Sequence, residues 1–180
     1  MINKLIKRER SLLSPQSIEE FEFIEGSRSA IADAENEGLK IYVISNQPDV
    51  SKDWRSLNEE KLREINDRLI EEGVEKVYNC THGPLNGKSD KTYTDQRGEI
   101  ITCDCRKPQP GLIAKCFKEN NLSLNESIIV GDSKTDILAA ERFEGDEKEE
   151  FRSKIKIGEN LGLCDKNMAC LKNVVEEVVR

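Results

Sequence analysis

The sequence predicts an α/β protein with a mainly parallel sheet. Apolar runs with little alternation, such as residues 39–44 and 127–130, are typical of strands covered on both faces. Other segments, such as residues 58–72, carry apolar residues at helical spacing. Strand and helix alternate along the chain, which is the pattern of parallel sheets with helices on their faces. At 180 residues the chain is expected to form a single domain, residues 1–180, with a substantial core.

Residues 1–15 are basic and show no helical or strand periodicity, so no element is predicted there. The first predicted element is therefore a helix further along the chain. Ser27 or Ser29 can cap a helix that runs to about Glu37, and Gly38 follows its end.

A predicted strand over residues 39–44 comes next and stops at the polar residues 45–48. Residues 58–72 form the second predicted helix, and residues 75–79 form a short strand that leads to Cys80. Residues 83–100 are polar and rich in Gly, Asp, Thr and Lys, so they predict a surface loop.

The second half continues the alternation of helix and strand. The predicted order is a helix over 112–120, a strand over 127–130, a helix over 135–143, an acidic loop over 144–150, a last strand over 154–157 and a closing helix over 173–179. Ligands of open parallel sheets bind at the carboxyl ends of the strands, so the polar residues after each strand are the first candidates for a site.

Composition excludes several classes of partner. Charged residues make up 35% and apolar residues 36% of the chain, and the low aromatic share of 5% predicts an aliphatic core. The net charge of −7 argues against nucleic acid or an anionic membrane as a partner. No apolar run approaches the roughly 18 residues that a membrane span needs. We expect a cytoplasmic monomer.

Four of the chain's metal-binding side chains occur in two close pairs. Cys80-Thr81-His82 and Cys103-Asp104-Cys105 offer three thiolates and one imidazole, a complete tetrahedral set for zinc. Such a metal leaves no open position for water, so we expect a structural zinc that closes a loop over residues 80–105. The alternative is that these are ordinary reduced cysteines near a turn. The other three cysteines lack this clustering and are interpreted as packing residues: Cys116, Cys164 and Cys170.

A basic turn follows the second pair. Arg106 and Lys107 are followed by Pro108, Pro110 and Gly111, which shape the backbone directly before a predicted helix. Positive side chains beside a helix start are typical of a phosphate site. The alternative for Lys107 is an ordinary solvated lysine.

Two further groups are suited to phosphate chemistry. Ser45 and Asn46 offer a hydroxyl and an amide at a strand end, although they can also be simple turn residues. Asp132 follows a buried strand and Asp136 lies one helical turn later, where carboxylates suit Mg²⁺; the alternative for Asp132 is helix capping. Together these groups indicate phosphoryl transfer, with magnesium and lysine neutralising the transition state.

The motifs resemble those of the haloacid dehalogenase (HAD) superfamily, in its zinc-containing branch of heptose bisphosphate and histidinol phosphatases. The resemblance rests on Cys-x-His, Cys-x-Cys, Cys-Arg-Lys-Pro-x-Pro-Gly, Ser-Asn-Gln, Phe-Glu-Phe-Ile-x-Gly and Gly-Asp-x-x-x-Asp, and covers about residues 1–142. It implies a Rossmann-like fold and hydrolysis of a sugar phosphate through an aspartyl-phosphate.

The resemblance also implies roles for individual residues. Ser45 would bind the transferring phosphoryl group, Lys107 would stabilise it and Asp132 would bind magnesium. Arg106 would contact the substrate. From their positions alone, Asn46 and Gln47 at the strand end are further candidate substrate contacts, and Asp136, one helical turn after Asp132, is a candidate to support the magnesium site. The zinc ligands of the family fall on Cys80, His82, Cys103 and Cys105.

One motif of the family departs from this pattern. The family carries Asp-x-Asp-Gly-x-x-Asn on a central first strand, and here only Met1-Ile2-Asn3 resembles its last positions; no Asp-x-Asp occurs elsewhere. We therefore expect the chain alone to be inactive and the edges of the neighbouring strands to be unpaired. A complete product is expected to begin about ten residues earlier, the length of a typical strand plus the motif.

The resemblance favours D-glycero-D-manno-heptose 1,7-bisphosphate as the substrate, with heptose 1-phosphate as the product. Two alternatives remain at this point. One is histidinol phosphate as the substrate, and the other is a non-catalytic, zinc-stabilised protein that binds a phosphorylated ligand.

Overall fold

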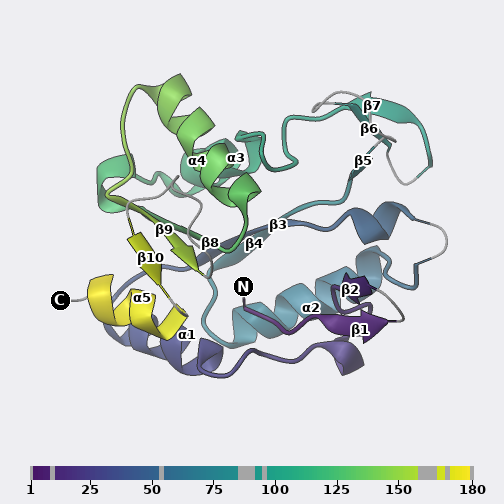
Figure 1. The fold of residues 1–180 in the computed structure, drawn as a ribbon, viewed down its shortest axis with the longest axis horizontal. Helices are drawn as coiled ribbons and strands as arrows, with labels where there is room; N and C mark the ends of the chain where they lie inside the picture. The colour runs from purple at the N-terminus through teal and green to yellow at the C-terminus, as the bar shows by residue number, and fades with distance from the viewer. Residues whose placement is uncertain are drawn as a thin grey trace.

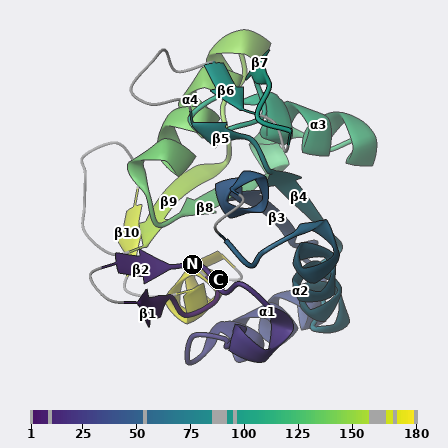
Figure 2. The ribbon, with the colours of Figure 1, turned by 90° about the vertical axis from the view of Figure 1, so that its right-hand side faces the viewer.

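The fold consists of two parallel sheets with helices on either side (Figures 1 and 2). The computed structural model describes residues 2–8, 11–52, 55–84, 92–94, 97–157, 166–168 and 171–178. The α/β class and the mainly parallel sheet predicted from the sequence are confirmed by this arrangement.

One parallel sheet pairs β3 (Tyr42–Asn46) with β4 (Lys76–Cys80), in a register that sets Ser45 opposite Asn79. The other has the order β10 (Lys166–Met168), β9 (Ser153–Ile157), β8 (Ile128–Gly131). Among the described residues, no strand pairs with the second edge of β3 or with the second edge of β8.

Five α-helices within the described residues cover the sheets. Their bounds are α1 (Ser27–Asn36), α2 (Glu59–Glu71), α3 (Gly111–Asn120), α4 (Lys134–Glu147) and α5 (Leu171–Val178). Helices α1, α2 and α5 lie on one side of the sheets, and α3 and α4 lie on the other (Figure 1). None of the described helices is long and apolar enough to cross a membrane.

The apolar faces predicted from helical spacing form the core. In α2, Leu62, Ile65 and Leu69 are buried, and the helix starts at Asn58, whose side chain accepts a hydrogen bond from the Lys61 backbone N–H at 2.9 Å. On the other side of the sheets, Phe143 of α4 packs edge-on against Phe117 of α3 at a ring separation of 5.0 Å. The helices therefore bury aliphatic and aromatic side chains against both faces of the strands.

Several short elements were not predicted from the sequence. The surface loop predicted over residues 83–100 is wrong for the described part, which forms an antiparallel sheet of β5 (Gly83–Pro84), β6 (Thr92–Thr94) and β7 (Ile100–Thr102). Within residues 1–15, β1 (Ile6–Arg8) pairs with β2 (Ser11–Leu13). Short 3-10 turns complete the chain: η1 (Ile18–Glu20), η2 (Pro48–Ser51) and η3 (Leu124–Glu126).

Two predicted boundaries and the prediction of the last strand are also wrong. The predicted acidic loop over residues 144–150 is helical as far as Glu147. The strand predicted over 39–44 lies at Tyr42–Asn46, so Ser45 and Asn46 end the strand instead of following it. The strand predicted as the last one is followed by β10. In each case contacts with neighbouring elements decide where the helix or strand begins and ends, and local composition does not show these contacts.

Candidate functional site

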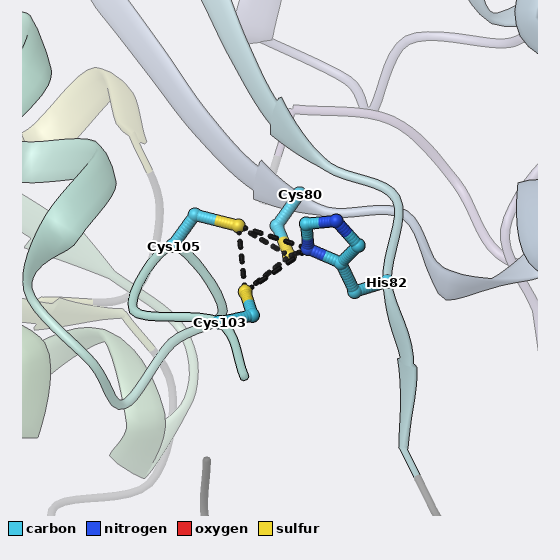
Figure 3. Close-up of side chains that lie close together, drawn as sticks. All are labelled: Cys80, His82, Cys103 and Cys105. Carbon is cyan, nitrogen blue, oxygen red and sulfur yellow. Dashed lines mark hydrogen bonds between the residues drawn. The ribbon is translucent and has the colours of Figure 1, made fainter. Parts of the chain in front are cut away.

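The two pairs of predicted metal ligands, Cys80 with His82 and Cys103 with Cys105, meet beyond the end of β4. Cys80 is the last residue of β4, and Cys103 follows β7, so two segments bring their side chains together (Figure 3). The four side chains of the cluster all lie within 4.8 Å of one another: Cys80, His82, Cys103 and Cys105. His82 Nδ1 lies 3.0 Å from Cys103 Sγ and 3.2 Å from Cys105 Sγ.

The donor atoms of this cluster are suited to a tetrahedral metal. Sulfur–sulfur separations range from 2.8 Å for Cys103 and Cys105 to 3.7 Å for Cys80 and Cys103. Zinc bonds of about 2.0–2.3 Å place neighbouring donors roughly 3–4 Å apart. A set of three sulfurs and one nitrogen is also the chemistry that zinc prefers, and all four positions are filled by protein.

The thiols of the cluster differ in acidity. A hydrogen bond from the Cys105 thiol lowers the pKa of Cys80 to about 5, whereas burial raises the pKa of Cys103. The hydrogen bond to Cys80 also raises the pKa of Cys105. One thiolate is therefore stabilised before any metal arrives, and a metal ion must displace the protons of the other thiols.

The backbone turn after the cluster is closed by Gly111. Its N–H donates to Asp104 O at 2.8 Å, and a Cβ at this position would lie 2.4 Å from that same oxygen. The Gln109 N–H donates to Arg106 O at 2.8 Å, and the Arg106 guanidinium donates to His82 O at 3.2 Å. Arg106 is therefore hydrogen-bonded to the backbone of His82, a member of the cysteine–histidine cluster.

The same turn presents Lys107 to the end of β3. The Asn46 side chain donates to Lys107 O and accepts from the Lys107 N–H, each at 3.0 Å. This reciprocal pair fixes the lysine backbone against the strand. Next to it, Gln47 Nε2 donates to Ser45 Oγ at 2.9 Å.

The Lys107 ammonium connects β3 with the start of α4. Its Nζ lies 2.6 Å from Ile44 O and 2.6 Å from Asp136 Oδ1. The side chains of Lys107 and Asp136 are only 15% and 11% exposed, so the ion pair is shielded from solvent. Burial by itself raises the pKa of Asp136, but the Lys107 charge and hydrogen bonds from Ser133 outweigh it and hold the pKa below its usual range.

The other oxygen of Asp136 organises the loop after β8. Asp136 Oδ2 accepts from the backbone N–H of Asp132 at 3.2 Å and of Ser133 at 2.9 Å, and from Ser133 Oγ at 2.7 Å. Ser133 is the N-cap of α4 in a capping box with Asp136, so the alternative interpretation of Asp132 as the helix cap is wrong. Gly131 permits this approach, because a Cβ there would lie 2.3 Å from the Cβ of Asp136.

These groups surround one cavity of about 840 Å³ between the two parallel sheets. Six of the predicted site residues line it: Ser45, Asn46, Gln47, Lys107, Asp132 and Asp136. Arg106 and the cysteine–histidine cluster do not line it. Cys116 is 2% exposed in an apolar cluster, consistent with packing, and Cys164 and Cys170 lie outside the described residues.

Sequence reasoning missed two features of this site. Ser133 was not singled out, although Ser133-Lys134-Thr135-Asp136 carries the spacing of a capping box. The Ile44 carbonyl could not be found from residue types, because every residue carries one and only the strand geometry directs it toward Lys107.

Comparisons with known proteins agree with this arrangement. A model of the haloacid dehalogenase-like hydrolases matches residues 99–145, from β7 to α4. D,D-heptose 1,7-bisphosphate phosphatase from B. bronchiseptica, solved in complex with magnesium and phosphate, superposes with a TM-score of 0.66. At 21% identity, over 91% of this chain and 87% of that chain, this likeness shows the fold.

Relatives with higher sequence identity carry similar names. The D-glycero-beta-D-manno-heptose-1,7-bisphosphate 7-phosphatase of Pasteurella multocida is 31% identical over 129 residues, 68% of this chain. The protein of the same name from Haemophilus ducreyi is 30% identical over 130 residues, 69% of this chain. The matches span 64% and 66% of these relatives, slightly less than two thirds of their length. Fold, family model and relatives together show that the chain belongs to the haloacid dehalogenase-like hydrolases.

Proposed function

We propose that this protein is a magnesium-dependent phosphatase that hydrolyses D-glycero-D-manno-heptose 1,7-bisphosphate to heptose 1-phosphate. The names of the relatives support the reaction and the substrate class. The observation that carries the proposal is a lysine ammonium held in a cavity at the carboxyl ends of parallel strands, beside a serine hydroxyl and two aspartates. Such a cluster neutralises the charge that develops on a transferring phosphoryl group.

Ser45 and Lys107 have separate tasks in this proposal. Because Gln47 already donates to Ser45 Oγ, the serine hydroxyl keeps its own proton to donate to a phosphoryl oxygen. Lys107 supplies a fixed positive charge, and Asn46 clamps its backbone so that the charge stays near the strand end. Arg106, next along the turn, would reach parts of the substrate outside the cavity.

Asp132 is the proposed magnesium ligand. It lines the cavity, whereas both oxygens of Asp136 are taken up by Lys107 and the Ser133 loop. One carboxylate is compatible with Mg²⁺, which often takes one or two protein carboxylates and completes its shell with water and phosphate. When bound, the ion would neutralise phosphate charge and orient the phosphoryl group. Asp136 would hold Lys107 and the Asp132 loop in place.

We also propose that the protein binds one structural zinc ion. Its proposed ligands are Cys80, His82, Cys103 and Cys105. The ion would fix Cys105 at the start of the turn that carries Arg106 and Lys107. Cys105 lies two residues before Lys107, which forms the ion pair with Asp136.

The proposed reaction passes through an aspartyl-phosphate, and these 180 residues contain no Asp-x-Asp motif. The test is therefore phosphate release, with magnesium, from this chain and from a form extended upstream in frame. We expect release only by the extended form, faster from heptose 1,7-bisphosphate than from histidinol phosphate, and lost on Asp132→Ala. Preference for histidinol phosphate would replace the proposed substrate.

A non-catalytic role is the second candidate, favoured by the same absence of an Asp-x-Asp motif. It predicts that both forms release no phosphate while the folded chain still binds inorganic phosphate in a Lys107-dependent manner. We further propose that the protein is cytoplasmic and a monomer. The net charge of −7 supports the monomer, because like charges oppose association, and a sizing column with calibrated mass measurement tests it.

A further inference from the structure

The three thiols of the cysteine–histidine cluster lie close enough to one another to react. Cys105 Sγ donates to Cys80 Sγ at 3.0 Å and lies 2.8 Å from Cys103 Sγ, whereas the sulfurs of Cys80 and Cys103 are 3.7 Å apart (Figure 3). A disulfide bond is about 2 Å long, so either pair that includes Cys105 can close through a small movement of the side chains. Cys105 is therefore common to both candidate disulfides.

Cys105 is also the thiol that a small oxidant can reach. Cys80 and Cys103 are only 1% and 5% exposed, whereas Cys105 is partly exposed at the start of the basic turn. Hydroperoxides oxidise accessible cysteines first, so the first oxidation is expected at Cys105. The sulfenic acid that forms can condense with a neighbouring thiol, and two thiols lie within 3.0 Å of this sulfur.

The backbone favours one of these two neighbours. Cys103 and Cys105 belong to the same short turn, and the carbonyl of Asp104 between them accepts the Gly111 N–H at 2.8 Å. A bond between Cys103 and Cys105 would close a small ring through Asp104, whose backbone this hydrogen bond already fixes. Cys80 lies on a different element, at the end of β4, so its bond to Cys105 leaves the Asp104 hydrogen bond in place.

We propose that Cys80 and Cys105 form a reversible disulfide on reaction with hydrogen peroxide or an organic hydroperoxide. The Cys105 thiolate attacks a peroxide oxygen and becomes a sulfenic acid, while the O–O bond breaks and the other oxygen takes a proton and leaves as water or an alcohol. The Cys80 thiolate then attacks this sulfur, the S–S bond forms, and the sulfenic oxygen takes a proton and leaves as water. The two sulfurs together lose two electrons, which the peroxide gains.

The disulfide would close the same loop as the proposed zinc ion. Both join the end of β4 to the start of the turn that carries Lys107. Once Cys80 and Cys105 are bonded to each other, Cys103 and His82 are the only remaining ligands of the set, so the ion is released. The oxidised chain loses zinc but keeps the turn tied to the strand, and the covalent link also restricts the unfolded chain. Zinc release rests on the proposed zinc site, whereas the disulfide can form in metal-free protein as well.

The test is peroxide treatment of the zinc-loaded chain, with Cys164→Ser and Cys170→Ser so that these two thiols cannot compete. We expect the intact mass to fall by two hydrogen atoms, and peptide mapping with fragmentation to place the link between Cys80 and Cys105. A chromogenic chelator should report one zinc ion released per disulfide. Cys116, which is 2% exposed and packed in an apolar cluster, is the internal control and should stay reduced. Dithiothreitol and zinc should restore the starting protein.

Two further variants separate the candidate pairs. Cys103→Ser should still form the cross-link and Cys105→Ser should form none, with circular dichroism reporting that both remain folded. If either variant misfolds, fragmentation of the linked peptides of the parent protein still identifies the pair. The oxidised parent should melt closer to the zinc-loaded form than to the chelated, reduced form.

Three results would overturn the proposal. They are a link between Cys103 and Cys105, a cross-link that persists in Cys105→Ser, and an oxidised parent that melts like the chelated, reduced form. A chain that forms the expected link but contains no zinc beforehand would support the disulfide and reject the zinc ligands, so the two proposals fail separately.

Discussion

Asp136 uses both carboxylate oxygens to connect parts of the site that are distant in sequence. Oδ1 lies 2.6 Å from the Lys107 ammonium, and Oδ2 accepts three hydrogen bonds from the loop of Asp132 and Ser133. Gly131 is the residue that lets this carboxylate approach. A change at Asp136 should therefore affect the charge of Lys107 and the position of Asp132 together.

Replacing this carboxylate by an amide should destabilise the fold. In Asp136→Asn the Lys107 ammonium stays shielded, at 15% exposure, without its counter-charge. Removing one partner of a buried pair costs about 3–5 kcal/mol, which urea unfolding can measure. The double variant Asp136→Asn, Lys107→Met removes both charges and should recover part of the loss. A change below about 0.5 kcal/mol in the single variant would contradict a buried ion pair.

The same carboxylate predicts a dependence of stability on pH. The Lys107 charge and the Ser133 hydrogen bonds hold the pKa of Asp136 in the folded state below its usual value. Its contribution is therefore complete above the unfolded pKa of about 3.9 and is lost as pH falls through the folded pKa. Unfolding measured from pH 6 to pH 3 should show the gap between native protein and Asp136→Asn shrinking below about pH 4. A gap that stays constant would show that folding does not lower the pKa of Asp136.

At the scale of elements, α4 shows why one boundary could not be predicted from the sequence. Gly145 and the charged residues around it indicate a loop, yet the helix continues to Glu147. Glu144 explains the difference, because its carboxylate accepts from Lys154 Nζ at 2.9 Å and from the Phe151 N–H at 2.9 Å. These contacts tie the last turns of the helix to β9, and such tertiary contacts override weak local propensity.

The extended helix makes a prediction for Gly145. No atom lies within 4 Å of a Cβ built there, so Gly145→Ala should stabilise the protein by about 0.5–1 kcal/mol in urea unfolding. Gly38→Ala is the matched control, since its Cβ also meets no atom but its φ is +74°. That variant should be destabilised, because only glycine adopts this conformation without strain. Equal effects of the two substitutions would argue against a helical Gly145.

The candidate site was partly predictable for a similar reason. Residue types and spacing identified the four residues of the cluster as candidate ligands. In the structure their ligand atoms all lie within 4.8 Å of one another, and their role as zinc ligands stays a prediction. Ser45 and Asp132 were expected at strand ends and Lys107 in a turn before a helix, and all three line one cavity. The pairing of Lys107 with Asp136 and with the Ile44 carbonyl depends on how α4 and β3 approach each other, which no local pattern encodes. Three-residue strands such as β6 and β7 are too short to show any periodicity.

At the scale of the whole molecule, the cysteine cluster joins segments that are more than twenty residues apart. The hydrogen bond between Cys80 and Cys103 spans a sequence separation of 23, and the antiparallel strands β5, β6 and β7 lie between these two residues. A metal bound here would close that loop and order the turn that carries Lys107. Metal affinity should therefore appear directly as folding stability.

Removing zinc should lower the stability of the entire chain. Elemental analysis is expected to give near one zinc per chain, and a strong chelator should lower the melting temperature by several degrees in calorimetry, because the ligands then lose their shared ion. Cys105→Ser should lose the metal and melt like the chelated protein. Cys116→Ala, which removes a buried thiol outside the cluster, should keep its zinc and still respond to the chelator. Metal-free protein that melts as the untreated protein does would show that the four side chains are ordinary packed thiols and an imidazole.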